Sequence, residues 1–136
     1  MADEWYRVLQ QEFNAHDGSF LLQLRSDLLW DKVAFSRLTS AMLECCKTYD
    51  TGNDPPTTHW PGSPYYDLTL PRWLTEGFWY VSTFVRDHTS HPAWREKIAR
   101  EPDYYDRAYE RLFWLAEWFF TGRCPFLDPD KAFMPM

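Results

Sequence analysis

The sequence predicts an all-α fold: a single-domain bundle of about five helices that spans residues 1–136 and carries one long loop. Apolar residues recur at helical spacing through most of the chain, whereas strand-like alternation occurs only in the short stretch YYDLTL. A length of 136 residues suits one domain. Hydrophobic residues make up 45% of the chain and aromatic residues 19%, which argues against disorder and indicates a core built largely from rings.

Two short helices are expected in the N-terminal part. Apolar side chains four residues apart predict the first helix over residues 4–15, with one stripe formed by Trp5, Leu9 and Phe13. The stretch HDGS then interrupts the pattern. Residues 20–30 predict a second helix, which either Asp17 or Ser19 can cap. Its expected inward residues are Leu21, Leu24 and Leu28.

Asp31 is expected to cap a third helix over residues 32–49. Six side chains at helical spacing form its expected core stripe: Ala34, Leu38, Ala41, Met42, Cys45 and Tyr49. Because Cys45 lies on that stripe, we expect a buried, inert thiol there and not a catalytic one.

Residues 50–70 predict an ordered long loop between the third and fourth helices. The Pro55-Pro56 pair lacks two backbone donors and does not fit a helix interior or a central strand. The segment carries three aspartates and no basic residue, so its net charge is −3. Rings and carboxylates side by side suit recognition of a basic protein. The candidate binding residues of this loop are Asp54, His59, Trp60, Tyr65, Tyr66 and Asp67.

The fourth helix is expected over residues 72–87, opened by Pro71. Its inward stripe comprises Leu74, Phe78, Val81 and Val85, with further rings beside it. So large an apolar circumference predicts a helix at the centre of the bundle. Gly77 weakens the helix by about 1 kcal/mol relative to alanine, so we expect a neighbouring ring or helix to cross closely there. Glu76 and Trp79 fall on the polar strip and are the two remaining candidate binding residues.

Two histidines three residues apart, His88 and His91, raise the question of a metal or proton-transfer site. Pro92 suits the first turn of a short helix, and a proline disfavours the helical conformation of the residue before it. We therefore expect His88 to close the fourth helix and His91 to be extended. The two imidazoles then leave a common helix face, and the sequence predicts a domain without metal or cofactor.

The last helix is expected to follow Pro102, with Asp103 as its cap and Gly122 just after its end. The expected inward stripe comprises Tyr105, Ala108, Tyr109, Leu112, Ala116 and Phe119. A polar stripe expected to face water comprises Asp103, Asp106, Glu110 and Glu117. The tail at 123–136 has no period, and three apolar residues are expected to hold it against the bundle: Phe126, Leu127 and Phe133.

Composition and missing motifs narrow the classes of function. There is no GxxxxGK[ST], GxGxxG, HExxH or GxSxG motif. Fourteen basic and twenty acidic residues give a net charge of −6, which disfavours nucleic acids and anionic membranes as partners. No apolar run approaches the length of a membrane span. Three cysteines without a disulfide pattern and an acidic N-terminus predict a cytoplasmic protein.

Together these features predict a non-enzymatic protein-binding factor that uses an acidic aromatic surface against a basic partner. Inhibitors and toxin-immunity proteins have this general composition. In that hypothesis Glu76 and Trp79 join the loop residues in one recognition surface; the alternative is that the loop simply covers Trp79. The rival function is a small helical enzyme or ligand-binding protein with an aromatic pocket near Glu76, His88 and His91.

Overall fold

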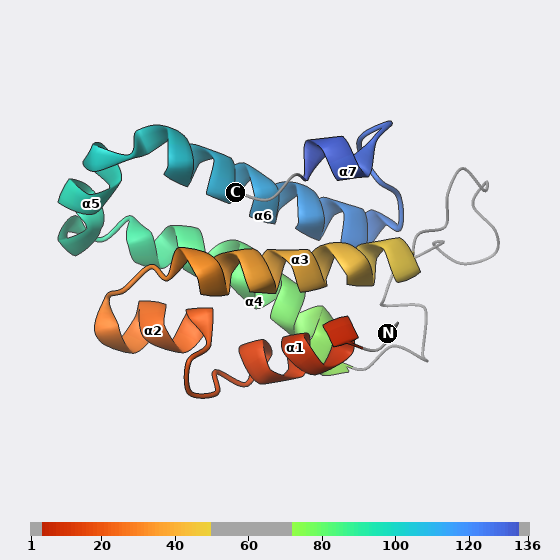
Figure 1. The fold of residues 1–136 in the computed structure, drawn as a ribbon, viewed down its shortest axis with the longest axis horizontal. Helices are drawn as coiled ribbons and strands as arrows, with labels where there is room; N and C mark the ends of the chain where they lie inside the picture. Colours follow the sequence, from red (N-terminus) through yellow and green to blue (C-terminus); the bar gives the residue numbers. More distant parts are fainter. Residues whose placement is uncertain (1–3, 50–71, 134–136) are drawn as a thin grey trace.

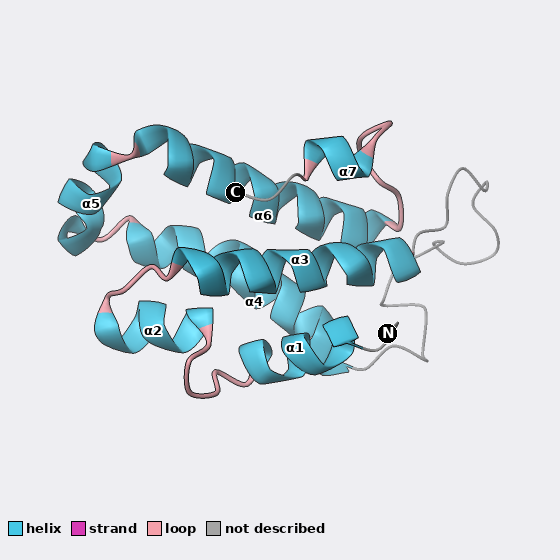
Figure 2. Cartoon of the chain, viewed as in Figure 1, coloured by secondary structure: helices cyan, strands magenta, loops and turns pink. Residues whose placement is uncertain are grey.

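The computed structural model describes residues 4–49 and 72–133. This part of the chain contains helices and connecting loops but no strand, which confirms the all-α prediction (Figure 2). The α-helices are α1 (Glu4–Phe13), α2 (Phe20–Asp27), α3 (Lys32–Thr48), α4 (Arg72–Thr89), α5 (Arg95–Arg100), α6 (Pro102–Thr121) and α7 (Pro129–Ala132), and a 3-10 helix, η1 (Pro92–Trp94), precedes α5. The count exceeds the expected five, in part because α7 lies in the tail that was expected to be irregular.

Four helices form the bundle, in the spatial order α1, α3, α6, α4 (Figure 1). Each packs on the next, and α4 closes the ring by packing on α1. α3 and α6 run in one direction and α1 and α4 in the other. The helices α2, η1 and α5 cover one end of the bundle, while α7 lies beside α6. Consecutive helices α3 and α4 therefore stand on a diagonal, which a connection as long as residues 50–71 permits.

The position of α4 differs from the prediction. It occupies one corner of the bundle and not its centre, with Trp79 59% exposed and Tyr80 36% exposed. Its expected inward stripe is nevertheless buried in full, from Leu74 to Val85. Every helix of a four-helix bundle has an outward face. In α4 the outward face carries aromatic rings. Apolar residues around most of the helix therefore did not mean that the whole helix is buried.

The glycine prediction is confirmed. A Cβ atom on Gly77 would lie 2.1 Å from Cδ2 of Phe13, so only glycine lets the Phe13 ring rest against α4. The ring also contacts Phe78 edge-on, at 6.1 Å between centroids. This contact fixes the crossing of α1 and α4.

The start and end of α2 test the next two predictions. Ser19 caps the helix, because its Oγ accepts a hydrogen bond from the Leu22 N–H at 3.2 Å. Leu28 does not point inward: it ends α2 in the left-handed conformation, with φ of 50°, and is 42% exposed. Trp30 fills the core beyond the turn instead, 4.9 Å from the Phe20 ring centroid. Because the helix ends at Asp27 and the chain then turns, Leu28 does not continue the inward stripe of α2.

The joint between α4 and η1 agrees with the prediction. His88 lies in the last turn of α4, and its Nε2 is 3.1 Å from the carbonyl oxygen of Leu24. His91 is extended, with φ of −63° and ψ of 142°, and its Nδ1 accepts the Ala93 N–H. The two imidazoles therefore serve two separate structural contacts.

The last helix begins two residues earlier than expected. Pro102 is its first residue and Asp103 lies in its first turn, so Asp103 is not the cap. Proline suits this position because the first helical N–H has no partner inside the helix. Gly122 ends the helix in the left-handed conformation, as predicted, with φ of 78°.

Two of the three apolar residues expected to hold the tail do so. Phe126 is 37% exposed but contacts the Trp114 ring of α6 edge-on, at 5.4 Å between centroids. Phe133 is 4% exposed and packs on Trp118, whereas Leu127 is fully exposed, contrary to the prediction. Asp128 caps α7, and Asp130 forms an ion pair of 2.6 Å with Lys47 of α3. A turn before α7 directs Leu127 into solvent.

Candidate functional site

The structure places two of the eight candidate binding residues. Glu76 and Trp79 both lie on the outward side of α4, whereas the six loop candidates lie outside the described residues. The Glu76 carboxylate is exposed and pairs with Arg72 at 2.9 Å. It is thus not a desolvated general acid. Trp79, at 59% exposure, is a large ring that the described bundle leaves open to solvent.

Contacts between α4 and α6 show what lies beside Trp79. The hydroxyl groups of Thr89 and Tyr109 are hydrogen-bonded at 2.6 Å, and the Arg86 guanidinium lies 5.3 Å from the centroid of the Tyr109 ring. Two turns back from Arg86, Trp79 occupies the same side of α4. One turn on from Tyr109, Phe113 occupies the same side of α6. Trp79 and Phe113 therefore share one side of the α4–α6 pair.

Phe113 is also 59% exposed, and carboxylates surround it on the helix. Two of them precede Phe113, Asp106 by seven residues and Glu110 by three, and Glu117 follows it by four. Residues at this spacing lie on one helix face. All three are exposed, and within the described part of the chain none of them forms an ion pair. We call the surface formed by Trp79, Asp106, Glu110, Phe113 and Glu117 the acidic aromatic face.

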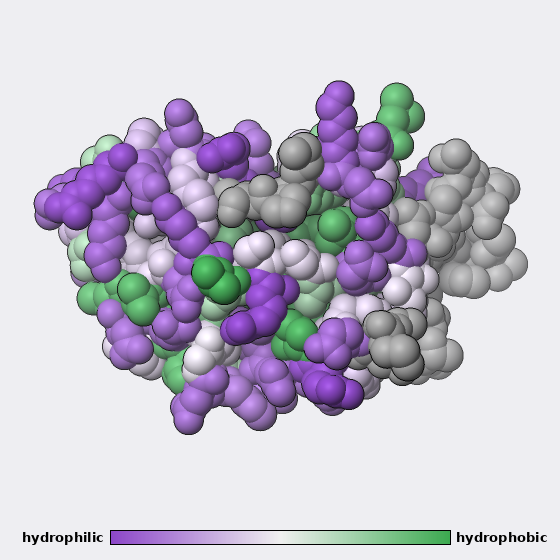
Figure 3. Space-filling view, in the orientation of Figure 1, coloured by the Kyte–Doolittle hydropathy of each residue, from purple (hydrophilic) through white to green (hydrophobic). Residues whose placement is uncertain are grey.

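The sequence contained the signal for Phe113, but it was missed. The polar stripe of the last helix was correctly expected to face water, and its acidic members are exposed. Helical spacing places Phe113 inside that stripe, where an aromatic residue is out of place for a solvated surface. The opposite side of the molecule differs: the face of α1 and α3 is mainly hydrophilic, with apolar side chains in separate places (Figure 3).

Glu12 of α1 is a second feature that the sequence analysis missed. Its side chain is 2% exposed, and both carboxylate oxygens lie 2.9 Å from the Phe20 backbone nitrogen, at the start of α2. Burial raises the pKa of the Glu12 carboxyl, although the Phe20 hydrogen bond and Arg37, 4.0 Å away, oppose that shift. A negative charge at a helix N-terminus is favourable. Glu12 therefore fixes α2 to α1 by capping it from outside.

A pocket of about 290 Å³ adjoins Glu12 and is also lined by His16, Asp17 and Arg37. A buried carboxyl of raised pKa in a pocket is a typical pattern of catalytic sites. Here the carboxylate is already bonded to the helix start through both oxygens. The structural role thus accounts for Glu12 without a reaction.

The rival enzyme hypothesis required Glu76, His88 and His91 in one pocket, and the structure does not bring them together. Glu76 and His88 are twelve residues apart on one helix, a separation of about 18 Å along its axis. His91 caps η1 beyond the helix end. Burial raises the pKa of the Cys45 thiol, as expected for an inert cysteine.

Three further findings bear on function. The described residues contain no group of three or more His, Cys, Asp or Glu side chains able to hold a metal ion. In the same part of the chain, no helix has the length and apolarity needed to cross a bilayer. Comparisons of the chain with protein-family models, curated proteins and solved structures give no significant match, so function has to be inferred from this geometry.

Proposed function

We propose that the protein is a non-enzymatic binding factor whose acidic aromatic face recognises a basic protein in the cytoplasm. The observation that carries this proposal is the exposed Phe113 ring among three carboxylates that form no ion pair within the described residues, on the side of the α4–α6 pair where Trp79 is also exposed. Rings of this kind supply most of the affinity in protein interfaces, because burying them removes much apolar surface from water. An inhibitor or a toxin-immunity protein acts in this manner.

The charge of the face selects the partner. Asp106, Glu110 and Glu117 carry three negative charges, and Arg86 of α4 contributes one opposing charge at the end of the face. Unpaired surface carboxylates attract a basic partner over a range of roughly 8 Å at physiological ionic strength. They repel phosphate backbones, so nucleic acid is not the expected partner.

The test uses immobilised protein and extract from the native organism. Three baits are compared: wild type, the double variant Trp79→Ser with Phe113→Ser, and the control Val33→Ser. Val33 is 76% exposed on α3, so its replacement removes apolar surface of a similar kind outside the face. We expect wild type and control to retain one basic protein that the double variant loses. Equal retention by all three baits would refute the proposal.

The purified partner then allows a kinetic test. Replacing Glu110 and Glu117 with glutamine should slow association while changing dissociation little, since long-range charge acts mainly on encounter. Added salt should slow the wild type toward the rate of this variant. An association rate that depends neither on salt nor on these two carboxylates would show that the partner is not selected by charge.

The expected contribution of the loop stays a prediction. Replacing Trp60, Tyr65 and Tyr66 together with serine should weaken binding of the same partner more than it weakens folding. Affinity and melting temperature are measured side by side. Unchanged affinity together with a strongly lowered melting temperature would assign these rings to the core.

A further inference from the structure

A pocket of about 370 Å³ lies where α1, α2 and α4 meet, on the side of α4 away from the acidic aromatic face. Its volume falls within the range of small-molecule sites, roughly 300–1,000 Å³. Tyr80 lines the pocket, whereas its neighbour Trp79 is not part of the lining, since successive helical residues point about 100° apart. The pocket is therefore separate from the proposed protein-binding surface.

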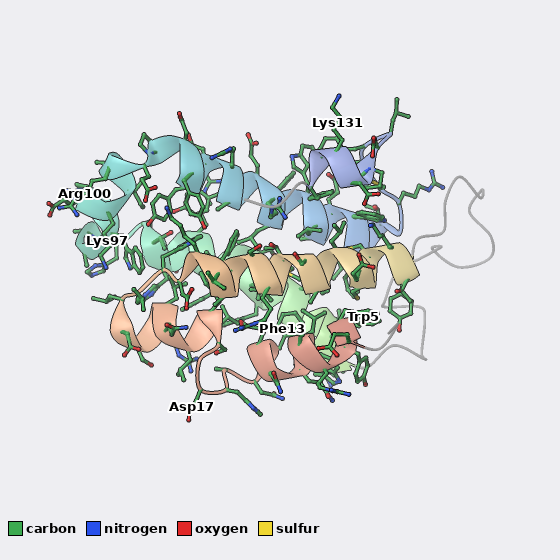
Figure 4. The ribbon with its side chains drawn as sticks, in the orientation of Figure 1. Trp5, Phe13, Asp17, Lys97, Arg100 and Lys131 are labelled. Carbon is green, nitrogen blue, oxygen red and sulfur yellow. The ribbon has the colours of Figure 1, made fainter. Side chains whose placement is uncertain are left out.

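Three rings form the apolar walls: Phe13, Trp73 and Tyr80. Phe13 projects from the end of α1 toward α4 (Figure 4) and meets the Trp73 ring edge-on at 6.0 Å between centroids. Tyr80 stacks on Phe84 at 4.9 Å, which holds its ring in place. Gly77 also lines the pocket, and a side chain there would displace the Phe13 ring. These walls are held by packing and suit a flat aromatic group.

Two charged residues line the same pocket, and only one of them is already neutralised. Glu76 pairs with Arg72 at 2.9 Å. Among the residues that the structure describes, none forms an ion pair or hydrogen bond with the Arg25 guanidinium. The charge available to a ligand is therefore positive. A guanidinium matches the planar, bidentate geometry of a carboxylate better than any other side chain does.

We propose that this pocket binds a small aromatic carboxylate, with its ring between Phe13, Trp73 and Tyr80 and its carboxylate on Arg25. The proposal does not depend on the acidic aromatic face or on its partner. It differs from the aromatic ligand pocket that the sequence suggested near Glu76, His88 and His91. Glu76 lines the present pocket, but Arg25 selects the ligand and the two histidines take no part.

Three compounds with one ring system and different charges provide the first test: indole-3-acetate, indole-3-acetamide and tryptamine. Binding to the wild-type protein is measured by calorimetry, and the position of binding by amide chemical shifts. We expect saturable one-to-one binding of the anion, with the largest shifts at Gly77 and Ala15. The neutral amide should bind at least about ten times more weakly, which corresponds to about 1.4 kcal/mol. Tryptamine should bind most weakly.

Variants then separate the charge from the rings. Arg25→Gln should lower the affinity for indole-3-acetate to that for the amide, and leave the affinity for the amide itself unchanged. Tyr80→Ser should weaken both. The matched control is Arg95→Gln, which removes an exposed arginine of α5 outside the pocket and should leave both affinities as in the wild type.

Three outcomes would overturn the proposal. One is the absence of saturable binding of indole-3-acetate up to about 1 mM, a weak affinity by any standard. Another is binding of tryptamine as tight as that of the anion. The third is an equal loss of affinity in the Arg25 and Arg95 variants, which would indicate nonspecific attraction of an anion to the surface.

Discussion

Leu112 and Phe113 are neighbours on α6, yet the structure assigns them to opposite regions. Leu112 is 2% exposed and faces the bundle, whereas Phe113 is 59% exposed and faces solvent among carboxylates. Both are large and apolar, so composition does not separate them. What separates them is the direction of the helix face, because α3 and α4 pack on one side of α6 only.

The inner and outer faces of α6 differ in what their apolar area contributes. The inner face is committed to folding, with Ala108, Leu112 and Leu115 almost inaccessible to water. The outer face still exposes a ring whose complete burial would contribute about 1.5–3 kcal/mol in total. Part of that gain remains available to a partner. Substitutions on the inner face should therefore lower the stability of the fold. Substitutions on the outer face should lower the affinity for the partner and leave stability nearly unchanged.

The largest expected effect comes from the inner face. Leu112→Ala should destabilise the protein by about 2–5 kcal/mol, since it removes buried methyl groups and leaves a cavity. Urea unfolding measures the change. A loss below about 0.5 kcal/mol, the size of a typical surface effect, would contradict the assignment of this face.

The next effect concerns the contact between α1 and α4. Gly77→Ala improves helix propensity by about 1 kcal/mol. The added methyl group meets the Phe13 ring at 2.1 Å, and overpacking of this kind costs about 1–3 kcal/mol, so we expect a net loss of up to about 2 kcal/mol. In a Phe13→Ala background the clash is absent, and the same substitution should stabilise. A stabilising effect in both backgrounds would show that the ring moves aside freely.

Carboxylates show the same contrast between inside and outside. Glu12 is buried, and its raised pKa means that the folded state binds its proton more tightly than the unfolded state does. Its contribution to stability is complete below the ordinary glutamate pKa and is lost as pH rises through the higher value in the folded protein. Glu12→Gln should therefore reduce the fall in stability over that pH interval, while still accepting the Phe20 N–H.

The matched control for Glu12 is Glu117→Gln, which replaces an exposed carboxylate of the outer face. It should leave the pH dependence of unfolding close to that of the wild type. Equal effects of the two substitutions would show that burial is not the cause of the Glu12 shift.

Local signals predicted most of the fold. Four features follow from backbone chemistry within a few residues, and the structure contains each of them: the caps Ser19 and Asp31, the close contact at Gly77 and the extended His91. One local signal failed, because the helix that Asp103 was expected to cap already begins at Pro102. Two other errors are of another kind. Leu28 and the central position of α4 depend on how the chain turns and on which helices meet, and the period of a single helix does not contain that information.

The candidate site follows the same division. The helix period placed Trp79 on the polar strip of α4 and left open whether the loop covers it; in the structure Trp79 is 59% exposed. Phe113 lies 34 positions away from Trp79 in the chain, and the contact of Arg86 with Tyr109 brings the helix faces of the two rings to the same side. Arg25 was missed because nothing in its local sequence indicates that α2 lies beside the aromatic residues of α1 and α4.

The smallest expected change in stability is the one that decides whether the outer face is a binding surface. Trp79→Ser together with Phe113→Ser should alter the free energy of unfolding by no more than about 1 kcal/mol, because each site is a surface position and such substitutions usually stay within about 0.5 kcal/mol. Urea unfolding of the double variant, compared with Leu112→Ala, measures this directly. If the double variant loses as much stability as Leu112→Ala, both rings are part of the folded core, and their exposure would no longer support a partner. If stability is kept while binding of the basic partner is lost, the two faces of α6 serve two different purposes, since folding depends on the inner face and recognition on the outer one.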